Sequence, residues 1–134
     1  MDGFLPERGN KRQLNVLGNE LEPCNFGLDK NNVVTGFYRD NCCNTGVDDV
    51  GLHTVCCIMT NEFLSFSKSV GNDLSTNIPE YNFPGLCDGD KWCLCASRWL
   101  EAFNAGKPPK VILKSTNIAT LSIVKLEYLK KHAM

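Results

Sequence analysis

The sequence lacks the features that assign a chain to several common classes of function. No apolar run approaches the roughly 20 residues of a membrane span. Basic residues are not in excess, since 14 Lys and Arg stand against 15 Asp and Glu. We therefore expect neither a membrane nor a nucleic acid as partner. P-loop, G-x-G-x-x-G, G-x-S-x-G and H-E-x-x-H motifs are absent as well, which leaves an unknown small molecule or protein as the expected partner.

Signals for export and for structural zinc are also missing. Residues 1–13 carry charges and a proline but no continuous apolar segment. They predict a flexible tail rather than a secretory signal, and we expect a cytoplasmic protein. The chain has no C-x₂-C pair, the spacing that structural zinc sites prefer. Zinc stays a candidate cofactor because Cys24, Cys42 or Cys43, and His53 can still converge in the folded chain. Cys24 and Cys56 are the candidate ligands.

Cysteine, by contrast, is abundant. The 134 residues include eight cysteines, at positions 24, 42, 43, 56, 57, 87, 93 and 95. A reducing cytosol keeps such residues as thiols, so their number alone does not establish a disulfide framework. The cysteines therefore indicate a thiol or metal site without defining its chemistry.

Hydrophobic patterning predicts an α+β domain over residues 14–134. The stretch 53–59 is β-rich and apolar on both faces, which is typical of a central strand, with Cys56 and Cys57 on opposite faces. Thr60 is a good N-cap for a helix that stops near Gly71. A short strand is expected at 111–113 and a final helix at 126–132. Because strands and helices do not alternate regularly, we expect a small sheet, two to three helices and long ordered loops.

The segment 91–105 carries the longest apolar stripe at helical spacing, which predicts a helix capped by Asp90. On such a helix Cys93 occupies the third position, close to free backbone N–H groups that favour a reactive thiolate. Cys95 falls in the buried stripe, where a cysteine behaves as a small hydrophobe. On a strand, the two cysteines would instead share one face.

Two loops supply most of the candidate site residues. Residues 35–53 and 71–90 are rich in Gly, Asn and Asp, and loops of this length in a compact domain often carry function. We expect them to meet near the start of the 91–105 segment. The candidate substrate-binding residues in these loops are Arg39, Asp40, Asn72, Asp73 and Asp90.

The candidate catalytic residues are thiols and one histidine. Cys42 and Cys43 follow an arginine in a polar loop, and thiols beside a guanidinium are more readily ionised than core thiols. Cys93 is the third candidate nucleophile. His53 is the only histidine outside the C-terminal tail and is a candidate general base. Its simpler role is a hydrogen-bonded residue at a strand end.

A series of motifs points to a known family. In order they are Asn15-Val16-Leu17-Gly18, Thr35-Gly36-Phe37-Tyr38-Arg39-Asp40, Cys42-Cys43, His53-Thr54-Val55-Cys56, Gly71-Asn72-Asp73-Leu74, Phe83-Pro84-Gly85-Leu86, Gly89-Asp90-Lys91-Trp92-Cys93-Leu94-Cys95-Ala96 and Arg98-Trp99. From about residue 15 to its end the chain resembles the uncharacterised family of small, mostly bacterial proteins known as domain of unknown function 2237.

The resemblance implies no activity, but it sorts the cysteines. Six match positions where the family is expected to have cysteine: Cys24, Cys42, Cys43, Cys56, Cys93 and Cys95. Cys57 and Cys87 are additions in this chain. Asn41 stands where the family usually has glycine, and Asn117 where histidine is expected, which argues against a catalytic histidine at that position.

Three functional hypotheses follow. The first is a small intracellular thiol protein with a redox-active or metal-binding cysteine site. The second is a cysteine-dependent enzyme with Cys93 or Cys42 as nucleophile and His53 as base. The third is a non-catalytic binding module whose cysteines fill the core. The exposure and mutual distances of the six family-position cysteines discriminate among them.

Overall fold

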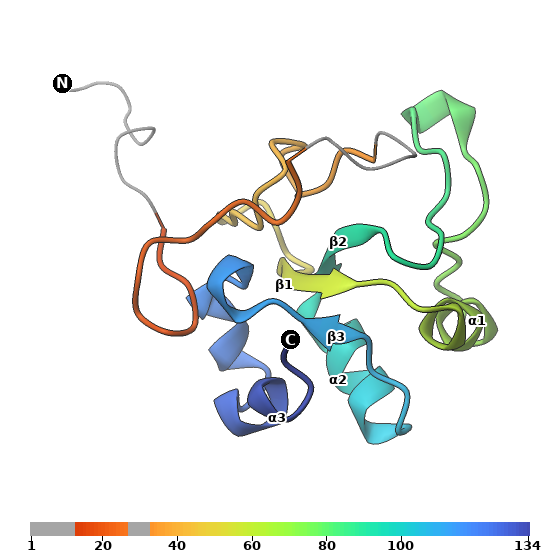
Figure 1. Cartoon of the computed structure of the whole chain (residues 1–134). Helices are drawn as coiled ribbons and strands as arrows, with labels where there is room; N and C mark the ends of the chain where they lie inside the picture. Colours follow the sequence, from red (N-terminus) through yellow and green to blue (C-terminus); the bar gives the residue numbers. More distant parts are fainter. Residues whose placement is uncertain (1–12, 27–32) are drawn as a thin grey trace, which may run out of the picture.

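The computed structural model describes residues 13–26 and 33–134. The predicted tail at 1–13 therefore lies outside the described residues except for Gln13. The described chain forms a small antiparallel sheet with three α-helices, which confirms the α+β class (Figure 1). The elements in order are β1 (His53–Ile58), α1 (Asn61–Ser69), η2 (Pro79–Tyr81), β2 (Lys91–Cys95), α2 (Ala96–Asn104), β3 (Lys110–Val111), η3 (Leu113–Ser115), η4 (Ile118–Ser122) and α3 (Leu126–Lys131).

The sheet has the order β2-β1-β3, so β1 is central as its two apolar faces predict. Cys56 faces Cys93 of β2 in the antiparallel ladder, and Cys57 faces Val111 of β3. Cys56 and Cys57 belong to different buried clusters, as expected for neighbours on a strand. Figure 1 shows the N-terminal loops on one side of the sheet, with α2 and α3 on the other.

The two faces of the sheet differ in chemistry. The face toward α2 and α3 holds the main core, which includes Trp92, Trp99 and Leu129. The opposite face holds a small cluster made of four cysteines, against which Ile112 packs. A hydrocarbon core thus stabilises one side of the sheet, and sulfur fills the other.

The helix predicted for 91–105 is wrong in its first part. Residues Lys91–Cys95 form β2, and α2 begins only at Ala96. Cys95, rather than Asp90, is the N-cap, and the Asp90 carboxylate accepts a hydrogen bond from the Cys87 backbone N–H at 2.8 Å. Pairing with β1 overrides the local helical pattern, because Trp92 and Leu94 also fit the two-residue period of a strand.

The other helices and strands begin and end close to the residues that the sequence predicts. Thr60 caps α1, its hydroxyl accepting a hydrogen bond from the Phe63 N–H at 3.0 Å. The final helix α3 ends one residue before the predicted boundary, at Lys131. The strand expected at 111–113 is shorter and begins earlier, at Lys110. Among the described helices, none is long and apolar enough to cross a membrane.

Candidate functional site

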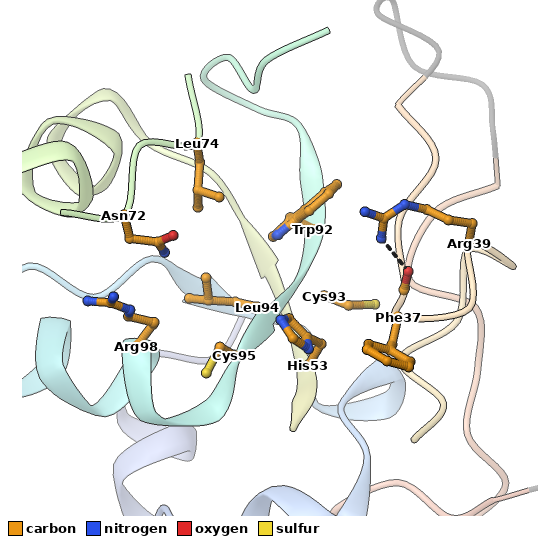
Figure 2. Close-up of a pocket in the computed structure, with 11 residues that line it drawn as sticks. Phe37, Arg39, His53, Asn72, Leu74, Trp92, Cys93, Leu94, Cys95 and Arg98 are labelled. Carbon is orange, nitrogen blue, oxygen red and sulfur yellow. Dashed lines mark hydrogen bonds between the residues drawn. The ribbon is translucent and has the colours of Figure 1, made fainter. Parts of the chain in front are cut away.

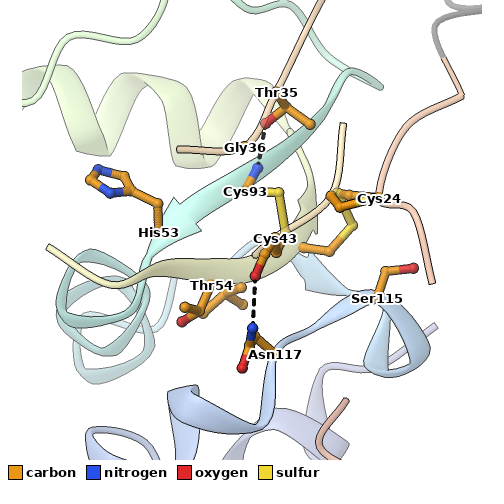
Figure 3. Close-up of a disulfide and its surroundings, with 12 residues drawn as sticks. Cys24, Thr35, Gly36, Cys43, His53, Thr54, Cys93, Ser115 and Asn117 are labelled. Atoms are coloured by element: carbon orange, nitrogen blue, oxygen red, sulfur yellow. Dashed lines mark hydrogen bonds between the residues drawn. A yellow bond between two sulfur atoms is a disulfide. The ribbon is translucent and has the colours of Figure 1, made fainter. Parts of the chain in front are cut away.

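Four of the eight cysteines form two disulfides that lie next to each other. Cys24 is bonded to Cys56, and Cys43 is bonded to Cys93 (Figure 3). Cys56 and Cys93 are cross-strand partners on the sheet, whereas Cys24 and Cys43 belong to the N-terminal loops. All four are at most 2% exposed. We call this set the sulfur cluster.

The two disulfides approach each other through Cys24. The Sγ atoms of Cys24, Cys43 and Cys93 all lie within 4.8 Å of one another. Three sulfurs at this separation can exchange bonds after a small side-chain movement, because exchange requires one sulfur to attack its neighbour. When reduced, the same three residues provide thiolates close to the roughly 3.8 Å spacing that zinc–sulfur bonds of about 2.3 Å require.

Three polar side chains hold the cluster's backbone in place. The Thr35 hydroxyl accepts a hydrogen bond from the Cys93 N–H at 2.7 Å, and the Thr116 hydroxyl accepts one from the Cys56 N–H at 3.1 Å. The Asn117 amide donates to the Cys43 carbonyl at 3.0 Å. Sequence reasoning did not assign these roles, although the departure from histidine at Asn117 was a signal.

Asn41 is a second departure from the expected family pattern, because it stands where the family usually has glycine. Its backbone has a φ of 64°, in the left-handed region where glycine, and after it asparagine, is best tolerated. The Asn41 amide oxygen also accepts a hydrogen bond from the Thr35 N–H at 3.0 Å. The substitution therefore keeps the turn that leads into the sulfur cluster.

The disulfides correct the expected thiol chemistry. Cys93 lies on strand β2 and not at the third position of a helix. Because Cys93 and Cys43 are bonded to each other, neither has a free thiol in this state. Cys24 and Cys56, the candidate zinc ligands, are bonded to each other. The prediction of a reactive Cys93 thiol depended on the 91–105 helix. On strand β2 the side chain of Cys93 instead points toward the other cysteines of the sulfur cluster.

The remaining four cysteines lie outside the disulfides and differ in exposure. Cys87 is exposed in a turn, and Cys42 and Cys95 are half-buried. Cys57 is buried in the main core, and this burial raises the pKa of its thiol well above the ordinary value. Cys95 is thus more accessible than the predicted apolar stripe implied, because it ends a strand instead of lining a helix.

A cavity of about 410 Å³ runs along the outer edge of β2, close to the sulfur cluster (Figure 2). Both predicted site loops contribute to it. Its walls are formed by Gly36, Phe37, Arg39, His53, Asn72, Leu74, Trp92, Cys93, Leu94, Cys95 and Arg98.

Of the predicted substrate-binding residues, the cavity brings together Arg39 and Asn72 and leaves out three carboxylates. Asp40 accepts hydrogen bonds from the Cys42 N–H and the Asn44 amide of its own loop. Asp73 is exposed and binds its own turn. Asp90, buried beneath its turn, does not line the cavity either. These carboxylates shape the loops around the cavity.

The cavity walls contain two guanidinium groups, those of Arg39 and Arg98. The described part of the chain contributes no Asp or Glu to these walls, and His53 is a further basic side chain in them. The Arg39 guanidinium lies 5.4 Å from the centre of the Trp92 ring and donates to the Gly36 carbonyl at 2.6 Å. Arg98 forms an ion pair with Glu101 at 3.1 Å on the outer side of α2.

His53 is oriented by a buried carboxylate. Its Nδ1 lies 2.7 Å from Oδ1 of Asp49, whose side chain is fully buried. The other oxygen of Asp49 accepts hydrogen bonds from the His53 N–H and the Thr45 hydroxyl. The ring stacks on Phe37 at 5.7 Å. Because Nδ1 faces the carboxylate, Nε2 is the nitrogen that can accept a proton.

The thiol that reaches the cavity is Cys95, the cross-strand partner of His53. Its Sγ donates to the Gly51 carbonyl at 2.8 Å and lies 3.2 Å from the Ser97 hydroxyl. Asp49 and Cys95 were not among the predicted site residues. The Asp-x₃-His spacing was the available signal for Asp49, whereas the misassigned helix concealed Cys95.

Comparison with family models agrees with the motifs. Residues 14–133 match the model described as "Uncharacterized protein conserved in bacteria (DUF2237)". The chain belongs to the DUF2237 family. No curated protein matches the sequence. The expected membership is confirmed, and the six cysteines assigned to DUF2237 positions prove to be the two disulfides together with Cys42 and Cys95.

Proposed function

We propose that this DUF2237 protein is a thiol–disulfide redox protein whose sulfur cluster accepts and returns electron pairs. The observation that carries the proposal is the position of Cys24, whose Sγ lies within 4.8 Å of both sulfurs of the Cys43–Cys93 disulfide. A purely structural cross-link does not require a second disulfide within exchange distance. In the cytoplasm, where we expect the protein, disulfides are usually transient and catalytic or redox-sensing.

The chemistry needs an external dithiol as reductant. Two successive exchanges convert the dithiol into a disulfide and the Cys43–Cys93 bond into two thiols. The thiolate of Cys43 or Cys93 then attacks Sγ of Cys24, which forms a new disulfide and expels the Cys56 thiolate. A proton from solvent neutralises the expelled thiolate. Cys93 is the disulfide cysteine that also borders the cavity, so the reductant approaches from that side.

The test is a redox titration of the folded protein. The native chain is equilibrated in dithiol–disulfide buffers of graded potential, alkylated rapidly, and analysed by peptide mass spectrometry for each cysteine. Structural disulfides usually have potentials below about −300 mV. We expect both disulfides to have midpoint reduction potentials less negative than that value. Near-ultraviolet circular dichroism should report an intact fold while they open. If they open only when the chain unfolds, they are static cross-links and the proposal fails.

A variant tests the exchange between the two disulfides. In Cys24→Ser, Cys43–Cys93 should still open, but both of its thiols should then stay reduced, because the Cys24–Cys56 disulfide that they would attack is missing. Cys87→Ser, which removes an exposed thiol outside the cluster, is the matched control. Zinc added to the fully reduced protein examines the metal-binding form of the proposal, because the reduced cluster offers three converging thiolates.

A second candidate function is a cysteine-dependent enzyme with Cys95 as nucleophile. The observation that favours it is the Asp49–His53 pair, which orients an imidazole in the cavity that contains the Cys95 thiol. Alkylation of Cys95 should then be slower in His53→Ala than in the unmodified protein. An unchanged rate would contradict a role for His53 as the base.

A further inference from the structure

The cavity beside β2 has two guanidinium groups in its walls and, among the described residues, no carboxylate. This is not the result of a general excess of basic residues, since the chain has 14 Lys and Arg against 15 Asp and Glu. Arg39 comes from the loop before β1 and Arg98 from α2, and Figure 2 shows them on opposite sides of the cavity. A ligand with two anionic groups therefore meets a guanidinium at each side.

Arg39 is held in place by neutral partners within the described chain. Its backbone N–H and its Nη1 both donate to the Gly36 carbonyl, at 2.9 and 2.6 Å. The guanidinium also lies 5.4 Å from the centre of the Trp92 ring, which is within cation–π range. Among the described residues no carboxylate forms an ion pair with this guanidinium. Because a guanidinium offers five N–H donors in a planar fork, Arg39 is preorganised to bind a carboxylate.

Arg98 has a carboxylate partner, but this partner does not line the cavity. Its Nη1 donates to Glu101 at 3.1 Å, three residues further along α2. The two side chains are 36% and 41% exposed, so the ion pair contributes little free energy and exchanges readily. Asn72 lies on the same side of the cavity in Figure 2, and within the described residues no hydrogen bond involves its side-chain amide. A ligand carboxylate can thus bind Arg98 and accept a second hydrogen bond from Asn72.

Apolar side chains supply further parts of the cavity walls. Phe37 and Leu74 are half-buried and Trp92 is 7% exposed, so the first two still have apolar surface that a ligand can cover. Leu74 and Trp92 also pack in or against the main core, which fixes their positions. The volume of about 410 Å³ lies in the usual range of small-molecule sites. A hydrocarbon segment of a ligand is therefore favoured against these walls, because it leaves no polar group without a hydrogen bond.

We propose that this cavity binds a small, elongated dicarboxylate with an apolar middle. One carboxylate binds the Arg39 guanidinium, and the other binds Arg98 together with the Asn72 amide. The apolar middle lies against Leu74. A doubly charged phosphate is less suitable at the Arg98 end, because Glu101 carries a like charge there. Binding changes the oxidation state of no cysteine, so this inference is independent of the redox proposal.

The experiment measures the binding of linear dicarboxylates, from succinate to suberate, to the oxidised protein by isothermal titration calorimetry. We expect saturable binding whose affinity peaks at one chain length. The monocarboxylate of that length and inorganic phosphate should bind at least about tenfold more weakly, because each leaves one arginine without a partner. Bound dicarboxylate should slow the alkylation of Cys95, which lines the cavity, and leave that of the exposed Cys87 unchanged. Equal affinity for dicarboxylate and monocarboxylate, or no protection of Cys95, would overturn the proposal.

Variants test the two ends of the site separately. Arg39→Gln and Arg98→Gln should each lower the affinity at least about tenfold. Lys107→Gln, which removes an exposed cation outside the cavity walls, is the control and should leave the affinity unchanged. Glu101→Gln removes the competitor for Arg98 and should raise the affinity, whereas Glu127→Gln, which removes an exposed carboxylate from α3, should not. Full affinity in either arginine variant, or weaker binding in Glu101→Gln, would contradict the site. Near-ultraviolet circular dichroism checks that each variant keeps the fold.

Discussion

Cys56 and Cys93 face each other across β1 and β2, yet each forms its disulfide with a different N-terminal loop. The bonds span 32 and 50 residues, so they fix two long irregular segments to one face of the sheet. These segments carry the Arg39 side of the cavity. The stability of the loops and the shape of the cavity are therefore coupled to the oxidation state of the cluster.

Removing the Cys24–Cys56 disulfide should destabilise the protein by about 2–5 kcal/mol, because the bond restricts the unfolded chain. The double variant Cys24→Ala/Cys56→Ala avoids leaving an unpaired thiol, and urea unfolding of the oxidised protein measures the change. Cys87→Ala should change stability by less than about 0.5 kcal/mol, the usual range for an exposed site. Equal stability of the two variants would contradict a structural contribution from the bond.

Trp99→Ala should cost about 3–5 kcal/mol, the scale for truncating a buried aromatic. Trp99 is fully buried, stacks on Phe103 at a ring separation of 5.4 Å and donates to the Pro109 carbonyl at 3.2 Å. Thermal or urea unfolding provides the measurement. Asn104→Ala, on the exposed part of the same helix, is the control, and a comparable effect at both sites would rule out the packing described for Trp99.

Native-state alkylation should label the cysteines in order of exposure. Cys87 should react first, followed by the half-buried Cys42 and Cys95. Cys57 should stay unlabelled until unfolding, because burial both blocks access and raises the pKa of its thiol. Timed labelling with peptide mass spectrometry gives the order. Rapid labelling of Cys57 in the native state would contradict its position in the core.

Asp49→Asn should change the proton position on His53 and cost about 1–3 kcal/mol, because a buried carboxylate that accepts three hydrogen bonds is replaced. The ¹⁵N spectrum of the imidazole reports the tautomer, and urea unfolding reports stability. Asp48→Asn removes an exposed carboxylate whose bond is to the Tyr38 hydroxyl, and it should leave both readouts nearly unchanged. A His53 tautomer that is the same in both variants would argue against orientation by Asp49.

Acid should weaken the turn after Asn72 in a defined pH window. Hydrogen bonds from the Thr76 hydroxyl and from Ser75 lower the pKa of Asp73 to about 2. The unfolded chain has the ordinary value of about 3.9. The contribution of Asp73 is therefore present above pH 3.9 and is lost as the pH falls toward 2. Carboxyl NMR titration should give the low pKa, and Asp73→Asn should reduce the loss of stability between pH 5 and pH 2.

Features of short range were predictable from the sequence. The motifs identified the family, and the two-sided apolar pattern identified β1 with Cys56 and Cys57 on opposite faces. Thr60 was recognised as a cap because capping depends on residues within one turn. The 91–105 helix failed at its start, since Trp92 and Leu94 satisfy both periodicities and only pairing with β1 decides between them.

The sequence by itself determined the family, the α+β class and the abundance of cysteine. The tertiary structure decided which cysteines pair, since bonds across 32 and 50 residues leave no local trace in the chain. It also brought Arg39, Asn72 and Arg98 around one cavity and placed Asp40, Asp73 and Asp90 outside it. Loop side chains have no periodicity to fix their direction, so their positions depend on the disulfides, turns and sheet edge that hold the loops.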